Sequence, residues 1–260
     1  MRNAMTALED LLFTIKPVAL AVMLAFFVAE RLRPAVAQTP DGRRLARNLS
    51  LWAGNIVLSL AVVVPVTVIA AEHGLGWRPE WWAATGGLLL DLLILDLWIY
   101  AWHRMNHEIP FLWRFHEVHH RDQTLDVWTA VRFHPGEVFL SALVRVPVIL
   151  ALGMPLVSVV VFEALVLMAA AFQHSNLALA PWLERGLSRV IVTPGIHWVH
   201  HHDRRADTDS NYATVLSLWD RLFGSRSATA RTPAMSLGVE GRDELSLIRL
   251  ALLPFANPSR

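Results

Sequence analysis

The stretch that decides the fold is DLWIYAWHRMNHEIPFLWRFHEVHH, residues 96–120. We expect an apolar helix to run into it and to end with His103 and His107, which lie one helical turn apart on the same face. After a break at residues 109–110, three further histidines follow, namely His116, His119 and His120. This spacing predicts a metal site at the mouth of a membrane helix.

The composition indicates an integral membrane protein. Of 260 residues, 54% are hydrophobic and 17% are charged, whereas soluble domains carry about 25% charged residues. The chain has no cysteine, which excludes disulfides, iron–sulfur clusters and thiolate zinc sites. A net charge of +1 gives no reason to expect nucleic-acid binding.

A second histidine cluster, HWVHH at 197–201, repeats the earlier spacing with His197, His200 and His201. A lone histidine is most often structural, and histidine tails that bind metal loosely lie in disordered polar segments. These clusters instead stand among Trp, Phe and Leu. Together they imply either two metals or one metal with unused histidines. Imidazole suits iron, zinc and copper, and the sequence does not choose among them.

The topology follows from the apolar segments and the arginines. Residues 11–29, with Lys16 and Pro17 near the start, 49–71 and 84–102 are spanning candidates. The loop 30–48 holds five arginines and the loop 72–83 holds one. The positive-inside rule therefore places loop 30–48 in the cytoplasm, the N-terminus outside and the first histidine cluster on the cytoplasmic face.

Residues 137–152 and 156–173 predict a helical hairpin that enters and leaves on the cytoplasmic side. At 1.5 Å per residue the first arm reaches about 24 Å, so a full crossing stays open. Arg145 and Glu163 lie equally far from Met154, and we expect them to form an ion pair.

The expected fold class is all-α integral membrane, with about four spanning or hairpin helices and a cytoplasmic helical cap that carries a histidine-rich dimetal site. The expected domains are an N-terminal transmembrane hairpin at 1–83, a catalytic domain at 84–230 and a tail at 231–260. In the tail, DELSLIRLALLP at 243–254 predicts an amphipathic interfacial helix.

Several charged or amide side chains are candidates to orient the ligands. Asp96 lies two helical turns before His103 and suits the carboxylate that a metal-bound imidazole usually contacts, with an ion pair to an arginine as the alternative. Asp91 is deeper and should face a polar interior. Weaker candidates are Glu117, Asp126, Glu137, Asp203, Asp209 and Asn211.

Six motifs carry a family resemblance. After Asp96 they are HRMNH (103–107), LWRFHEVHH (112–120), RFHPGE (132–137), QHSN (173–176), HWVHHH (197–202) and TDSNY followed by LSLWDRLFG (208–224). Over about residues 90–225 the chain resembles the fatty acid hydroxylase/sterol desaturase superfamily of membrane di-iron enzymes.

The resemblance implies which residues hold metal. It carries over to the eight histidines of the clusters and adds His174 as a ligand. His134 is implied as a ligand or as a hydrogen-bond partner of one. His202 is expected to be solvated and His73 uninvolved. The implied cofactor is a pair of iron ions, with zinc as the alternative in isolated protein.

The implied activity is oxygen-dependent hydroxylation or desaturation of a lipid, such as a sterol or fatty acyl chain, in a bacterial inner membrane. The expected partners are the lipid, the membrane and an external ferredoxin- or cytochrome-like electron donor. Two alternatives stay open. A metal transporter would place its ligands near the bilayer midplane, whereas these lie at helix ends. A metal-dependent lipid hydrolase fits less well with a site made of histidines alone.

Overall fold

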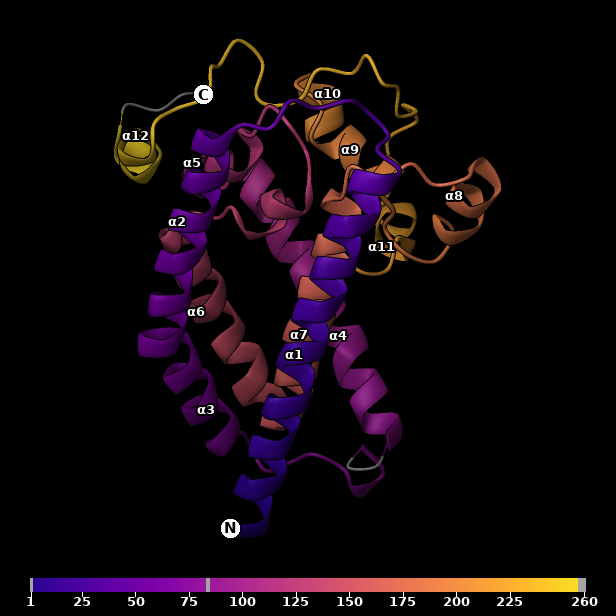
Figure 1. Cartoon of the computed structure of the whole chain (residues 1–260). Helices are drawn as coiled ribbons and strands as arrows, with labels where there is room; N and C mark the ends of the chain where they lie inside the picture. Colours follow the sequence, from indigo (N-terminus) through magenta and orange to yellow (C-terminus); the bar gives the residue numbers. More distant parts are fainter. Residues whose placement is uncertain (1, 83–84, 257–260) are drawn as a thin grey trace.

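The structure is a computed structural model that describes the backbone of residues 2–82 and 85–256, and the side chains of these residues except 2–13, 16 and 85. The described chain is helical (Figure 1). Its elements are α1 (Arg2–Leu32), α2 (Gly42–Leu58), η1 (Ser59–Val63), α3 (Val64–Glu72), η2 (Glu80–Trp82), α4 (Thr85–Glu108), α5 (Pro110–His120), η3 (Val127–Val131), α6 (Pro135–Leu152), α7 (Leu156–His174), α8 (Pro181–Leu187), α9 (Pro194–His200), α10 (Arg205–Thr208), α11 (Leu218–Leu222), α12 (Leu247–Leu252) and η4 (Leu253–Phe255).

Four helical stretches among the described residues are long and apolar enough to cross a membrane, namely Gly42–Glu72, Gly86–Glu108, Pro135–Leu152 and Leu156–His174. The predicted all-α integral membrane fold is therefore confirmed, and both arms of the 137–173 hairpin have spanning length. The side chain of Lys16 and residues 83 and 84, where the sequence places a domain boundary, lie outside the described residues.

Helix α1 differs from the prediction at its start, because it begins at Arg2 and contains Pro17 in its interior. Pro17 is therefore not a first-turn proline. The crossing formed by α2 and α3 also contains a proline, Pro65, which follows the single π-helical turn η1. Proline has no backbone N–H to donate, and the wider hydrogen-bond spacing of a π-helical turn accommodates the missing bond.

The long helices surround the α6–α7 hairpin. Helix α1 packs along α7, while α2 and α3 pack along α6, so the N-terminal helices pack mainly against different arms of the hairpin. Figure 1 shows the short helices gathered at one end of this bundle, opposite the N-terminus. We call this end, residues 110–134 and 175–256, the cap.

The hairpin is closed by Gly153, whose φ of 54° is a left-handed conformation that ends α6. Arg145 donates a 2.7 Å hydrogen bond to Glu163 across the two arms, as the equal spacing from Met154 predicts. Asp91 accepts hydrogen bonds from Arg78, Trp82 and Ser158, and this polar group fastens the loop before α4 to α7.

The cap is attached to α2 by buried ion pairs. Arg44 of α2 donates to Asp122 at 2.6 Å and to Asp126 at 2.7 Å, and the buried cap residue Arg132 donates to Asn48 Oδ1 of α2 at 3.0 Å. In the C-terminal segment, α12 buries Leu250 and exposes Ile248 and Leu252. This distribution has the form that an interfacial helix requires.

Candidate metal centre

Three helix ends bring the clustered histidines together. Helix α4 presents His103 and His107 one turn apart, and α5 presents three histidines before it ends at His120. Helix α9 consists of PGIHWVH, and its proline at the first turn fixes where it begins. Within each helix, backbone hydrogen bonds set the positions of these rings relative to one another, and the packing of the three helix ends brings the sets together.

The structure sorts the nine predicted histidines into two groups, and within each group one ligand atom per residue lies within 4.8 Å of all the others. Group 1 contains His103, His107, His116, His120 and His200; group 2 contains His119, His174, His197 and His201. The groups adjoin, since the rings of His120 and His201 stack with their centroids 4.4 Å apart.

The hydrogen bonds of group 1 fix which ring nitrogen is free to bind. His103 contacts the Tyr212 carbonyl through Nδ1 at 2.8 Å, and His200 contacts the Ser210 carbonyl through Nδ1 at 2.6 Å. A carbonyl accepts only, so both Nδ1 atoms carry the proton and both Nε2 atoms present lone pairs. These Nε2 atoms lie 3.1 Å apart, a separation that is favourable only when a cation lies among them.

Group 2 repeats this arrangement. His119 donates Nδ1–H to the carbonyl of Arg132 at 3.1 Å, and His174 donates to that of Ala170 at 2.8 Å. Their Nε2 atoms lie 3.0 Å apart, and Nε2 of His197 lies 2.9 Å from that of His174. Converging lone pairs in both groups therefore fit two cations.

Burial strengthens this conclusion. His120 is fully buried, and neither of its ring nitrogens has a hydrogen-bond partner among the described residues, an arrangement that is costly unless a ligand supplies the missing interaction. Burial lowers the pKa of His200 to about 3, and burial followed by repulsion from neighbouring imidazoles lowers the pKa of His119 and His201. These rings are neutral at pH 7, as metal ligands must be.

Two carboxylates contact histidines of group 1. Glu137 Oε1 lies 2.8 Å from His116 Nδ1 and also accepts from Asn106, and Asp209 Oδ1 lies 3.4 Å from His107 Nδ1. Both were weak candidates in the sequence. The geometry gives Glu137 the orienting contact that metal-bound imidazoles usually have, while Asp209 lies at ion-pair distance from His107.

Asp96 has a different role from the one predicted. Its carboxylate accepts from the backbone N–H groups of Val215 and Leu216 and from Trp219 Nε1 at 2.8 Å, and it contacts no histidine. Among the residues that the structure describes, Asp96 has no arginine partner either. Asp96 instead holds α4 against the cap segment before α11, because the backbone N–H groups of that segment point toward the buried Asp96 carboxylate.

His134 and Asp126 lie outside both groups. His134 accepts from Gly136 N at the start of α6 and contacts the Ala251 carbonyl through Nε2 at 3.1 Å. It therefore caps α6 and holds α12, and the structure does not bring it to the ligands. Asp126 binds Arg44 and caps η3.

Asn211 orients ligands through the backbone. Its φ of 53° is the left-handed conformation that asparagine tolerates better than most residues, and it places the carbonyls of Ser210 and Tyr212 against His200 and His103. Its side chain donates to the Ile196 carbonyl and accepts from Ser227 N. The sequence identified Asn211 but not these carbonyls, because a backbone acceptor has no residue-type signal.

The remaining histidines lie apart from the two groups. His202 is not solvated as predicted, since its Nδ1 lies 2.8 Å from Asp207 and its side chain is 12% exposed. His73 lies just beyond the far end of α3 and contacts the Ile69 carbonyl of that helix. Glu117 forms an ion pair with Arg121.

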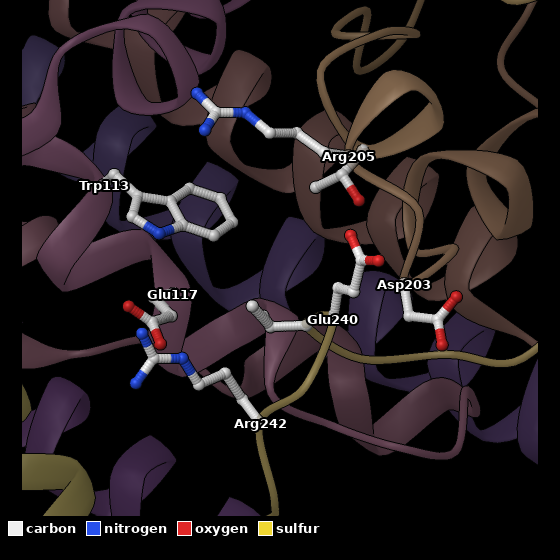
Figure 2. Close-up of a pocket in the computed structure, with 8 residues that line it drawn as sticks. Trp113, Glu117, Asp203, Arg205, Glu240 and Arg242 are labelled. Carbon is white, nitrogen blue, oxygen red and sulfur yellow. The ribbon is translucent and has the colours of Figure 1, made fainter. Parts of the chain in front are cut away.

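A pocket of about 170 Å³ opens on the cap beside group 1. Figure 2 shows the Trp113 indole on one side of it, with Glu117 and Arg242 below and Arg205, Glu240 and Asp203 opposite. The ring of Trp113 lies 5.1 Å from that of His107 and 5.4 Å from that of His120. Trp113, which the sequence analysis did not single out, therefore separates the candidate centre from this pocket.

Fold and site together define a helical membrane protein with a buried histidine centre suited to two cations. The model of the family described as "Fatty acid hydroxylase" matches residues 88–225, and the chain belongs to this family. The family resemblance drawn from the histidine motifs is thereby confirmed.

Curated relatives share an oxygenating activity by name. The chain is 28% identical to ornithine lipid hydroxylase OlsE of Rhizobium tropici, over 95% of this chain and 77% of the relative. It is 33% identical to alkylglycerol monooxygenase of Danio rerio, over 56% of this chain and only 30% of that protein. It is 26% identical to cholesterol 25-hydroxylase of Rattus norvegicus, over 78% of this chain and 67% of the relative. No solved structure matches.

These relatives are hydroxylases and monooxygenases, which are oxidoreductases, and membership of their family makes this chain an oxidoreductase.

Proposed function

We propose that this chain is a di-iron oxygenase that hydroxylates or desaturates a membrane lipid with molecular oxygen and electrons from a separate donor. The observation that carries the proposal is the convergence of nine buried histidines in two adjacent groups at the ends of membrane helices. The names of the relatives, which concern ornithine lipid, alkylglycerol and cholesterol, support a lipid as the substrate.

In this proposal each residue has a defined task. The Nε2 atoms of His103, His200, His119 and His174 bind the metals, and the carbonyls that accept their Nδ1 protons keep the rings in the binding tautomer. Glu137 orients His116 in the same way. When bound, two iron ions would supply the redox chemistry by which oxygen oxidises a C–H bond.

Burial gives the site its second property. Eight of the nine histidines are buried and His103 is partly buried, so the surrounding protein excludes water from the reacting groups. The Arg-rich loop after α1 lies at the cap end, which supports a cytoplasmic cap and an external N-terminus. The similarity to a bacterial ornithine lipid hydroxylase supports a bacterial inner membrane as the location. The chain has no cysteine for an iron–sulfur centre, so electrons would come from a ferredoxin- or cytochrome-like protein that docks on the cap.

The test combines metal analysis of the purified protein with mass spectrometry of host lipids, with and without expression. We expect about two iron ions per chain and lipids that gain one oxygen atom or lose two hydrogen atoms. Metal flux into vesicles without oxygen consumption would instead indicate a transporter, and release of lipid fragments without oxygen would indicate a hydrolase.

A further inference from the structure

A second cavity, larger than the pocket at Trp113, lies between the end of α1, α8 and the segment 226–233. Its volume is about 860 Å³, within the range of about 300–1,000 Å³ that is typical of small-molecule sites. Its lining includes the apolar residues Val36, Ala178, Leu179 and Pro181 and the charged residues Arg226 and Arg231. A lining that is both apolar and charged suits a molecule that has both characters.

Arg231 is the unusual residue of this cleft. Its guanidinium stacks over the Trp198 ring at 4.0 Å and donates through Nη1 to the Leu177 carbonyl at 3.3 Å. Its Nη2 is buried and has no hydrogen-bond partner among the described residues, and it forms no ion pair within that part of the chain. Burial lowers the pKa of Arg231 to about 10, so the group is still charged at pH 7.

A buried guanidinium N–H without a partner is costly unless an acceptor is supplied from outside. Arg226 lines the same cleft with an exposed side chain, and Glu184 is the one acidic residue of the lining. Glu184 already accepts a hydrogen bond from Thr193. Two arginines against one glutamate leave the lining with a net positive charge, which favours an acidic ligand.

The position of the cleft points to a lipid. The segment after α1 pairs with the segment after α7. Ala35 N donates to the Asn176 carbonyl at 2.8 Å, and Ala178 N donates to the Arg33 carbonyl at 2.8 Å. This part of the cleft therefore lies where two long apolar helices end. Trp182, next to the lining residue Pro181, is 69% exposed, and exposed tryptophans are typical of the membrane interface.

We propose that this cleft binds the acidic group, a phosphate or carboxylate, of a polar membrane lipid through Arg231 and Arg226. Trp198, under Arg231, directly follows the group 2 histidine His197 in α9. A helix is roughly 10 Å across, so a lipid held here lies within reach of the candidate centre. The assignment of this lipid as substrate rests on the proposed function; the binding itself does not.

The experiment measures binding to the full chain in detergent, without oxygen or reductant. The probes are dioctanoyl phosphatidic acid, dioctanoylglycerol, which lacks the phosphate, and inorganic phosphate. We expect phosphatidic acid to bind at least about tenfold more tightly than the other two, and R231Q to remove about tenfold of that affinity. The matched control is R185Q, because Arg185 is exposed on α8 and does not line the cleft.

Three outcomes overturn the proposal: equal affinity for phosphatidic acid and dioctanoylglycerol, unchanged affinity in R231Q, or inorganic phosphate that binds as tightly as the lipid. If R231Q does not fold, the exposed Arg226 carries the test, and R226Q must then weaken phosphatidic acid binding at least about threefold. Lipid binding without lipid oxidation would refute the proposed function alone, and oxidation without this headgroup selectivity would refute the cleft alone.

Discussion

The Nε2 atoms of His103 and His200 lie 3.1 Å apart although 97 residues separate the two histidines in the chain. Each ring is held by a backbone carbonyl on its other nitrogen. The contact therefore joins two lone pairs, which repel each other in the absence of a cation.

Removing one imidazole from either group should release metal. We expect His200→Ala and His201→Ala each to lower the iron content of purified protein from about two per chain to one or none and to abolish lipid oxidation. His73→Ala should keep both, because His73 lies beyond the far end of α3. Elemental analysis of the three variants measures this, and full iron in both cluster variants would exclude the metal assignment.

Glu137→Gln should weaken metal binding without removing a ligand. The carboxylate lies 2.8 Å from His116 Nδ1, and loss of such an orienting contact typically costs about 10–100-fold in metal affinity. Competition with a chelator measures the change. Glu108→Gln is the control, because Glu108 pairs with Arg104 on the exposed side of α4; equal affinity in the two variants would contradict the orienting role.

Asn211 should be replaceable by glycine more easily than by alanine. Alanine in the left-handed conformation costs roughly 1–2 kcal/mol, whereas glycine adopts it freely. Both substitutions remove the side-chain hydrogen bonds, so a difference in iron content between the two variants reports the effect of the backbone conformation. We expect Asn211→Gly to retain more iron than Asn211→Ala. If the two variants retain the same iron, the left-handed turn does not position the carbonyls of Ser210 and Tyr212.

The stability of the cap should fall in acid because of Asp122. Burial alone would raise the pKa of Asp122, but the charges of Arg44 and Arg132 outweigh it and lower the pKa. A lowered pKa means that the stabilisation is complete above about pH 4, the ordinary value for aspartate, and is lost as pH falls through the folded-state value.

Thermal unfolding in detergent as a function of pH measures this effect. Asp122→Asn should destabilise the protein by about 1.5–3 kcal/mol at pH 7, because it removes one of the two carboxylates that bind the partly buried Arg44, and should flatten the acid dependence. An Asp122→Asn variant as stable as the parent at pH 7 would show that these ion pairs do not hold the cap.

Arg145 and Glu163 should be coupled in the membrane. The Arg145 side chain is 9% exposed and donates to Glu163 at 2.7 Å. Glu163→Leu leaves this arginine unpaired, at a cost of about 3 kcal/mol for an arginine within the bilayer. The double variant Arg145→Met/Glu163→Leu should be more stable than Glu163→Leu alone. Additive effects in a double-mutant cycle would indicate that the two charges are independent.

Local patterns in the sequence are sufficient to predict much of this protein. The length and apolarity of a segment decide whether it crosses a bilayer, and the spacing of histidines on one helix decides which rings share a face. For this reason the helical hairpin, the Arg145–Glu163 pair and the eight clustered histidines were identifiable, whereas His174 was identified only through the family resemblance. These properties depend on residues within one segment, or on two residues that lie equally far from one turn.

The tertiary structure alone decided how the histidines divide into two groups and which atoms orient them. His119 and His120 are adjacent in the chain and belong to different groups, because consecutive residues on a helix point in different directions. The orienting acceptors are largely backbone carbonyls, which every residue carries, so no residue type marks them. Asp96 and His134 have the residue types of a metal site and serve structural contacts instead, since their partners come from segments whose approach only the folded chain determines.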